Sequence, residues 1–140
     1  MSLYTPQVLG LAAELADYPL TGAFAHRATA RSRTCGSVMD IGLDCNLQGA
    51  VSRVGMKLAA CAMGQASAAI MAAGLIGRDP AAIIAARASL ERWLGENGEL
   101  PDWPQIGLLA PALSHKGRHG ALILPWTAAC EALCSIGSSG

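Results

Sequence analysis

The feature that most constrains this fold is a change in the spacing of apolar residues near position 60. Before it, from Ser37 to Ala59, apolar and polar residues alternate, which is the two-residue period of a half-buried strand. After it, residues 61–76 are rich in alanine and follow the spacing of a helix that ends at Gly77. Because both patterns occur in one short chain, we expect a mixed α/β (α+β) fold.

The alternating stretch contains a turn, Asn46-Leu47-Gln48-Gly49, and therefore predicts an antiparallel hairpin. If Cys45 faces Ala50 across this turn, Ile41 faces Val54. Opposite residues of a hairpin share a face of the sheet. The apolar positions of the two strands then agree, which supports this register.

A third strand is expected between Gly22 and Ser32, where polar and apolar residues also alternate. One side of this segment is basic, which is a common protection of an edge strand against edge-to-edge pairing. This basic stripe is also the candidate partner-binding surface, and its residues are Arg27, Arg31 and Arg33.

Helix signals cover most of the remaining chain. Thr5-Pro6 is a helix start and Tyr18-Pro19 a stop, while Asp79-Pro80 opens a helix that runs to about Gly95. The last helix is expected over about 121–135, and residues 96–118 form a long connection with one short helical turn. We therefore expect a small, mostly antiparallel three-stranded sheet packed against four to five helices, as one domain over residues 1–140.

Charge and composition exclude several classes of function. The formal net charge is zero, so the chain has no electrostatic reason to seek nucleic acid or an anionic membrane. No apolar run reaches the ~18 residues of a membrane span, and the N-terminus lacks a secretory signal. We expect a cytoplasmic protein whose five cysteines are thiols. No nucleophile–base–acid set, phosphate loop or carboxylate pair indicates an enzyme.

The expected hairpin register brings two cysteines together. Pairing Cys45 with Ala50 also pairs Cys35 with Ala60, so that Cys35 and Cys61 meet at the open end of the hairpin. Cross-strand neighbours are about 5 Å apart. The two sulfur atoms could therefore bind one ion.

A third candidate ligand is His119, which lies at the expected start of the last helix. The helix dipole favours a thiolate at Cys61 and a neutral, ligating imidazole at His119. Two thiolates and an imidazole suit zinc or an iron–sulfur cluster. The alternative is that these cysteines are small apolar fillers of the core. Packing is the expected role of the other three cysteines: Cys45, Cys130 and Cys134.

These residues resemble motifs of the U-type iron–sulfur assembly scaffolds, which are IscU, SufU and the N-terminal domain of NifU. That family has a Cys-Gly-Asp motif opening a strand, then a hairpin, then a G-C-x-x-x-x-A-S-S segment opening a long helix. Cys35-Gly36 matches the first motif, and Cys61 with Gln65-Ala66-Ser67-Ala68 matches the second. The Asp79-Pro80 helix and a final helix after Arg118-His119 follow in the family's order, so the likeness covers residues from about 3 to 135.

The resemblance implies a scaffold with an IscU-like fold. Such proteins take sulfur from a cysteine desulfurase, assemble a [2Fe–2S] cluster on three cysteines and an auxiliary ligand, and pass it to acceptor apoproteins. Some members bind zinc at the same site. Carried onto this chain, the resemblance implies Cys35, Cys61 and His119 as ligands of iron, a cluster or zinc, with Ser37 and Arg118 in auxiliary positions.

The chain departs from the family pattern at three places. Ser37 replaces the family's Asp, and Gly120 stands where the third cysteine is expected. The chaperone-recognition motif Leu-Pro-Pro-Val-Lys is absent, and LSHKGRH stands there instead. Three hypotheses follow: a metal- or cluster-binding scaffold, a sulfur acceptor for a desulfurase without a stable cluster, and a metal-free interaction module.

Overall fold

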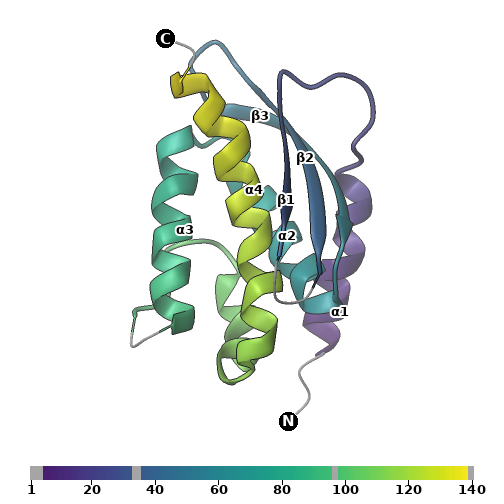
Figure 1. The fold of residues 1–140 in the computed structure, drawn as a ribbon, viewed down its shortest axis with the longest axis vertical. Helices are drawn as coiled ribbons and strands as arrows, with labels where there is room; N and C mark the ends of the chain where they lie inside the picture. Colours follow the sequence, from purple (N-terminus) through teal and green to yellow (C-terminus); the bar gives the residue numbers. More distant parts are fainter. Residues whose placement is uncertain (1–4, 33–35, 96–97, 139–140) are drawn as a thin grey trace.

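The computed structural model describes residues 5–32, 36–95 and 98–138, and its elements confirm the expected mixture of strands and helices (Figure 1). The three strands are β1 (His26–Arg31), β2 (Val38–Cys45) and β3 (Val51–Ala59). The α-helices are α1 (Pro6–Ala13), α2 (Ala62–Leu75), α3 (Pro80–Gly95) and α4 (His119–Ser138). Short 3₁₀ helices are η1 (Glu14–Asp17), η2 (Ile106–Ser114) and η3 (Lys116–Arg118).

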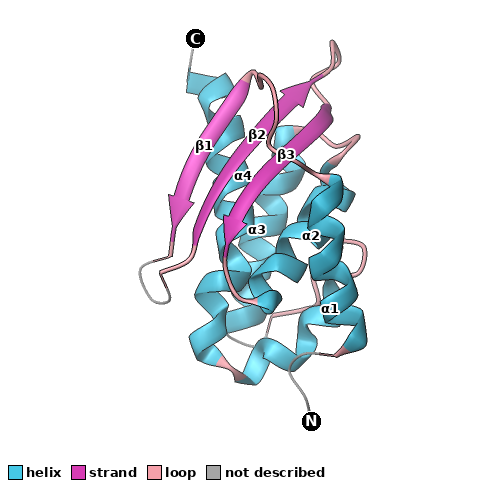
Figure 2. Ribbon diagram, turned by 90° about the vertical axis from the view of Figure 1, so that its right-hand side faces the viewer, coloured by secondary structure: helices cyan, strands magenta, loops and turns pink. Residues whose placement is uncertain are grey.

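The helices are layered against one face of the sheet. Figure 2 shows the sheet in front, in the order β1-β2-β3, with α2, α3 and α4 behind it. Helix α4 contacts β1 and β2, α3 packs on α4, and α1 packs on α2. Met39, Ile41 and Leu43 of β2 are fully buried beneath these helices. Among the described residues, no helix has both the length and the apolarity needed to cross a membrane.

The predicted hairpin exists, but its predicted register is wrong by two residues. Ile41 faces Met56, not Val54, and Cys45 faces Val51. The loop holds one residue more than expected, because the side chain of Asn46 accepts hydrogen bonds from the backbone N–H groups of Gln48 and Ala50. A β-bulge beside Cys45 adds the second residue. A shift of two leaves each side chain on its original face.

A segment before β1 lies across the outer face of the sheet. The ring of Phe24 rests on Gly42 and Gly55, which face each other on β2 and β3. The Arg53 guanidinium lies 3.9 Å from the centre of that ring and forms an ion pair with Asp44. The hydrogen bond from the backbone N–H of residue 25 and the bond from Arg53 lower the pKa of Asp44. The two glycines therefore provide the space that this cover requires.

Helices α2 and α4 approach each other closely. A Cβ atom added at Gly64 would lie 3.2 Å from the Cβ atom of Ala121. The fully buried hydroxyl of Ser67 donates to the Leu122 carbonyl at 2.6 Å and accepts from Trp126 Nε1 at 2.9 Å. The absence of a side chain at Gly64 permits the contact, and the hydroxyl fixes its register.

The predicted starts of the first three α-helices are confirmed, whereas α4 begins two residues earlier and ends three residues later than predicted. Thr5 caps α1 through a bond from the Val8 N–H group, and the Asp79 carboxylate accepts from Ala82 N–H at the start of α3. Gly77, with φ 91°, follows α2. The long connection before α4 is more ordered than predicted, because η2 continues to Ser114.

The connection also packs into the core. Trp103 donates its Nε1 hydrogen to the Ile70 carbonyl of α2, and its ring contacts the Trp126 ring edge-to-face. Ile106 and Leu109 of η2 are buried as well. The segment therefore forms part of the helical layer and supports the start of α4.

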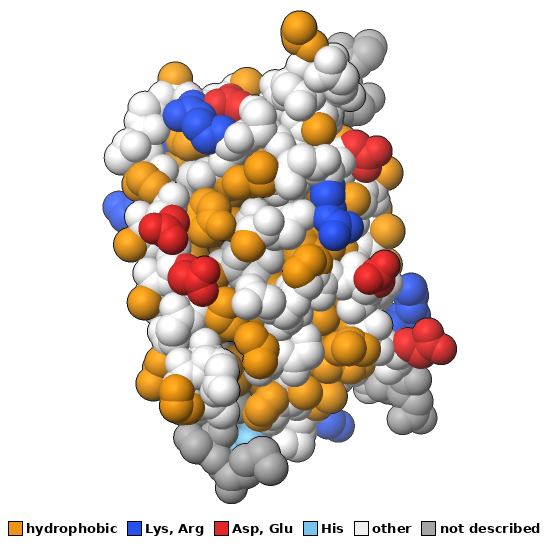
Figure 3. Space-filling view, turned by 180° about the vertical axis from the view of Figure 1, so that it is seen from behind, with side chains coloured by type: hydrophobic (Ala, Val, Ile, Leu, Met, Phe, Trp, Pro, Cys, Tyr) orange, Lys and Arg blue, Asp and Glu red, His pale blue; other side chains and the backbone are white. Residues whose placement is uncertain are grey.

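Apolar side chains also occur on the surface, spread among polar ones on the face shown in Figure 3. The large exposed ones come from different elements and connections, and they are Leu9, Leu47, Ile76, Ile84 and Leu100. Scattered apolar side chains are ordinary on a protein surface.

Replacing Gly42 with alanine tests the cover over the sheet. The new Cβ atom would lie 2.6 Å from Cδ2 of Phe24, so we expect the free energy of unfolding to fall by about 1–3 kcal/mol. In a Phe24→Ala background the same change should cost almost nothing. Urea unfolding measures both values. Gly10→Ala is the control, because no atom lies within 4 Å of its added Cβ atom; a cost at Gly42 that persists without Phe24 would contradict the packing account.

Replacing Ser67 with alanine tests the tie between α2 and α4. The change leaves the buried Trp126 N–H group without its acceptor, and we expect a loss of about 1–3 kcal/mol in the free energy of unfolding. Ser52→Ala removes an exposed hydroxyl and should change stability by no more than about 0.5 kcal/mol. Equal stability of the two variants in urea unfolding would rule out a structural role for the Ser67 hydroxyl.

Candidate metal centre

Cys61 lies at the N-cap position of α2, as the sequence predicts. Its backbone is extended, with φ −66° and ψ 167°, and its side chain makes no capping hydrogen bond. The thiol is free and half-buried. Gln65, one turn later, fixes this corner, because its side-chain amide donates to the Ala60 carbonyl and its backbone N–H donates to the Cys61 carbonyl, both at 3.0 Å. The Cys61 thiol at this corner is therefore not used in capping the helix.

Cys35 and Arg33 lie outside the described residues, so the predicted meeting of Cys35 and Cys61 stays a prediction. The described neighbours define the end of the hairpin at which it would occur. The last β2–β3 pair is Val38 with Ala59. Gly36 lies two positions before Val38, and Cys61 lies two positions after Ala59. Gly36 has φ +72°, a conformation that favours glycine.

His119 is the first residue of α4, as predicted, and its ring is anchored by η2. Its Nε2 atom lies 3.1 Å from the carbonyl oxygens of both Ala112 and Leu113. Because carbonyl oxygens only accept, Nε2 carries the hydrogen, and in a neutral ring the lone pair is on Nδ1. Nδ1 is therefore the atom through which this ring could bind a metal ion.

The first turns of α2 and α4 adjoin each other. The contact of Gly64 with Ala121 lies three residues after Cys61 and two after His119. The structure therefore brings these two helix starts together, while the His119 ring is held toward η2. Within the described residues, no group of three or more His, Cys, Asp or Glu side chains lies close enough to hold a metal ion.

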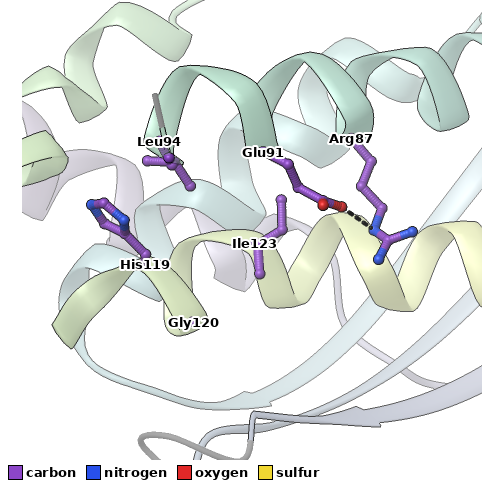
Figure 4. Close-up of a pocket in the computed structure, with 7 residues that line it drawn as sticks. Arg87, Glu91, Leu94, His119, Gly120 and Ile123 are labelled. Carbon is purple, nitrogen blue, oxygen red and sulfur yellow. Dashed lines mark ion pairs between the residues drawn. The ribbon is translucent and has the colours of Figure 1, made fainter. Parts of the chain in front are cut away.

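A pocket of about 370 Å³ opens beside His119, between α3 and α4 (Figure 4). Its lining includes Arg87, Glu91, Leu94, His119, Gly120 and Ile123. Arg87 forms an ion pair with Glu91 at 3.2 Å and donates to the Thr127 hydroxyl. The sequence does not predict this pocket. The feature of the sequence that points to it is the i, i+4 spacing of Arg87 and Glu91, and this spacing is common on any exposed helix.

The auxiliary and partner-binding residues lie in different surroundings. Ser37 is 6% exposed, and its carbonyl accepts a hydrogen bond from the Ser32 N–H group. Arg118 is exposed at the end of η3. Arg27 and Arg31 are exposed on β1, as the basic-face prediction requires.

The remaining cysteines include two that pack as predicted. Cys130 is buried, with its sulfur 3.7 Å from the Ile83 carbonyl oxygen. Cys45 packs against the core beside the bulge, where burial, and after it the Asp44 carboxylate, raises the pKa of its thiol. The side chain of Cys134 lies outside what the structure describes.

Comparison with known proteins finds likeness in structure. No family model and no curated protein matches the sequence. The N-terminal domain of a nitrogen-fixing NifU-like protein from Brucella abortus is 28% identical, with a TM-score of 0.90; the match covers 99% of this chain and 96% of that one. A protein assigned as an iron–sulfur cluster assembly scaffold of the SUF system, from the thermophile Fervidobacterium islandicum AW-1, is 16% identical with a TM-score of 0.84; the match covers 94% of this chain and 96% of that one.

The second likeness shows the fold, and the first extends over nearly the whole of both chains at a higher identity. Together with the order of motifs and helices in the sequence, they confirm the resemblance of this chain to the U-type iron–sulfur cluster assembly scaffolds.

Proposed function

We propose that this protein is a scaffold on which iron or a [2Fe–2S] cluster is assembled as cargo. Cys35 and Cys61 would be its thiolate ligands and His119 a third ligand, and zinc is the alternative ion for the same donors. A cysteine desulfurase would supply the sulfur, and acceptor apoproteins would receive the cluster. The proposal assigns no catalytic reaction to the chain itself.

The observation that carries the proposal is the position of Cys61. Its thiol is half-buried and makes no capping bond. It lies beside the unpaired N–H groups of the first turn of α2, which favour a negatively charged ligand or cargo. The turn of α2 that follows Cys61 contacts the start of α4, the element that carries His119, through Gly64 and Ala121. A thiolate at such a junction is accessible to cargo and to a partner protein.

The donor set supports a weakly held cargo. Gly120 offers no third thiolate, and His119 offers only Nδ1, because Nε2 is bonded to η2. Three ligands from the chain leave one coordination position for water or a partner's group. An incomplete protein shell suits transfer to acceptors better than permanent storage.

Anaerobic purification of the chain and its variants tests the proposal. We expect iron and sulfide, with the visible absorbance of a cluster, to be lost in Cys35→Ala and in Cys61→Ala. His119→Ala should weaken metal affinity by more than about tenfold, the scale reached when an outer-sphere partner is lost. Elemental analysis and absorbance spectra measure these outcomes.

Cys45→Ala is the matched control, since this cysteine is also half-buried and free but lies at the turn end of the hairpin. It should keep its metal content. Iron content that is equal in Cys35→Ala, Cys61→Ala and the unmodified chain would reject the thiolate ligands. Unchanged affinity in His119→Ala would remove the histidine from the set.

A second candidate function is sulfur relay, which needs only the half-buried Cys61 thiol that makes no capping hydrogen bond. In this reaction the Cys61 thiolate attacks the outer sulfur of the desulfurase persulfide. A new S–S bond forms at Cys61, the desulfurase S–S bond breaks, and the desulfurase thiolate leaves. A stable cluster is not required.

Labelled sulfur separates relay from assembly. After chelator treatment, the metal-free chain should still take label from a desulfurase supplied with labelled cysteine, and Cys61→Ala should take none. Cys45→Ala should behave like the unmodified chain. If removing Cys35 or Cys61 alters neither metal content nor sulfur uptake, both chemical functions fail. A metal-free interaction module then remains, with Arg27, Arg31 and Arg33 as its binding face.

A further inference from the structure

The two edges of the sheet differ in how their backbone groups are satisfied. The outer edge of β3 is covered by other parts of the chain. The Met56 N–H group donates to the Tyr18 carbonyl at 2.8 Å, and at the other end Val51 exchanges hydrogen bonds with Gly77 and Arg78. This edge is therefore closed to a further strand.

Among the residues that the structure describes, none pairs with the opposite edge, which is formed by β1. Strand β1 pairs with β2 alone, and Figure 2 shows it as the outermost strand of the sheet. Within the described chain, the backbone of His26–Arg31 forms no hydrogen bond outside its ladder with β2. In an antiparallel ladder alternate residues direct N–H and C=O groups away from the partner strand. With respect to residues 5–32, 36–95 and 98–138, β1 therefore presents a row of donors and acceptors without a partner.

The open edge is bordered by positive charge. Arg27 and Arg31 are exposed on the outer face of β1, roughly 13 Å apart by strand geometry. The ion pairs of the described residues are Arg53–Asp44 and Arg87–Glu91, and neither involves β1. The nearest carboxylate across the ladder, Asp40, accepts a hydrogen bond from Thr29. The two guanidinium groups are thus available to a partner's acids.

Charge also makes a second copy of this chain a poor occupant. An antiparallel pairing of two β1 strands about Thr29 would set Arg27 of each copy against Arg31 of the other. Like charges directly opposite each other in a sheet are destabilising, and charged edge residues are a known protection against self-pairing. The edge therefore selects a strand of opposite charge.

We propose that β1 binds an extended acidic segment of a partner protein, which adds to the sheet as a fourth strand. The backbone of β1 would supply the hydrogen bonds. Arg27 and Arg31 would select a segment with carboxylates four residues apart on its outer face. This inference is independent of the metal centre, because no candidate ligand takes part in it.

A synthetic peptide is the probe for this edge. It alternates valine and threonine over ten residues and carries two glutamates four residues apart. NMR titration of the full chain should show binding that weakens with salt and slower hydrogen exchange at alternate amides of β1. Charge reversal of both arginines, R27E with R31E, should weaken binding by about tenfold. Arg92→Glu, an exposed position on α3, should leave it unchanged.

Modified peptides separate strand addition from simple charge attraction. A peptide with lysines in place of the glutamates should not bind. Two further peptides are methylated at every second backbone nitrogen: in one the methyl groups point toward β1, and in the other they point away from it. The peptide whose methyl groups point toward β1 should fail to bind. Equal binding of both methylated peptides, or binding without protection of β1 amides, would overturn the proposal. Undiminished binding to the doubly reversed variant would overturn it as well.

Discussion

The close approach of α2 and α4 is the constraint on which the rest of the structure depends. Gly64 lets the two backbones meet at Ala121, and the Ser67 hydroxyl joins α2 to Leu122 and Trp126. The inner face of the sheet packs on these helices, and α3 packs on α4. Cys61 is the N-cap residue of α2, and His119 is the first residue of α4. The contact between the two helices therefore also sets where these two candidate ligands can lie.

The elements of the fold could be predicted because their signals are local. The change of period near residue 60, the Thr5 and Asp79 caps and Gly77 each act within a few residues, and each is confirmed. The register could not be predicted in the same way. A shift by two residues leaves every apolar side chain on the same face, so the pattern cannot distinguish the two pairings. The Asn46 hydrogen bonds and the bulge at Cys45 make that choice.

The candidate site likewise has features that local sequence signals predict and features that they do not. The sequence predicts that Cys61 and His119 stand at helix starts, since caps and glycines mark those positions. The hydrogen bonds that turn the His119 ring toward η2 depend on carbonyl groups of a segment expected to be mostly loop. The pocket beside it depends on how α3 lies against α4. Both features arise from contacts between distant segments, which a local pattern does not encode.

The cover over the outer face of the sheet has a consequence for how relatives of this chain can diverge. Phe24 fits because two facing positions, Gly42 and Gly55, have no side chain. A side chain gained at Gly42 competes with the aromatic ring for space, and loss of the ring frees that position. Gly55 stays restricted even then, because an added Cβ atom would lie 2.7 Å from the Pro19 carbonyl oxygen. Phe24 and Gly42 should therefore change together during evolution, although they lie far apart in the sequence, whereas Gly55 should stay glycine.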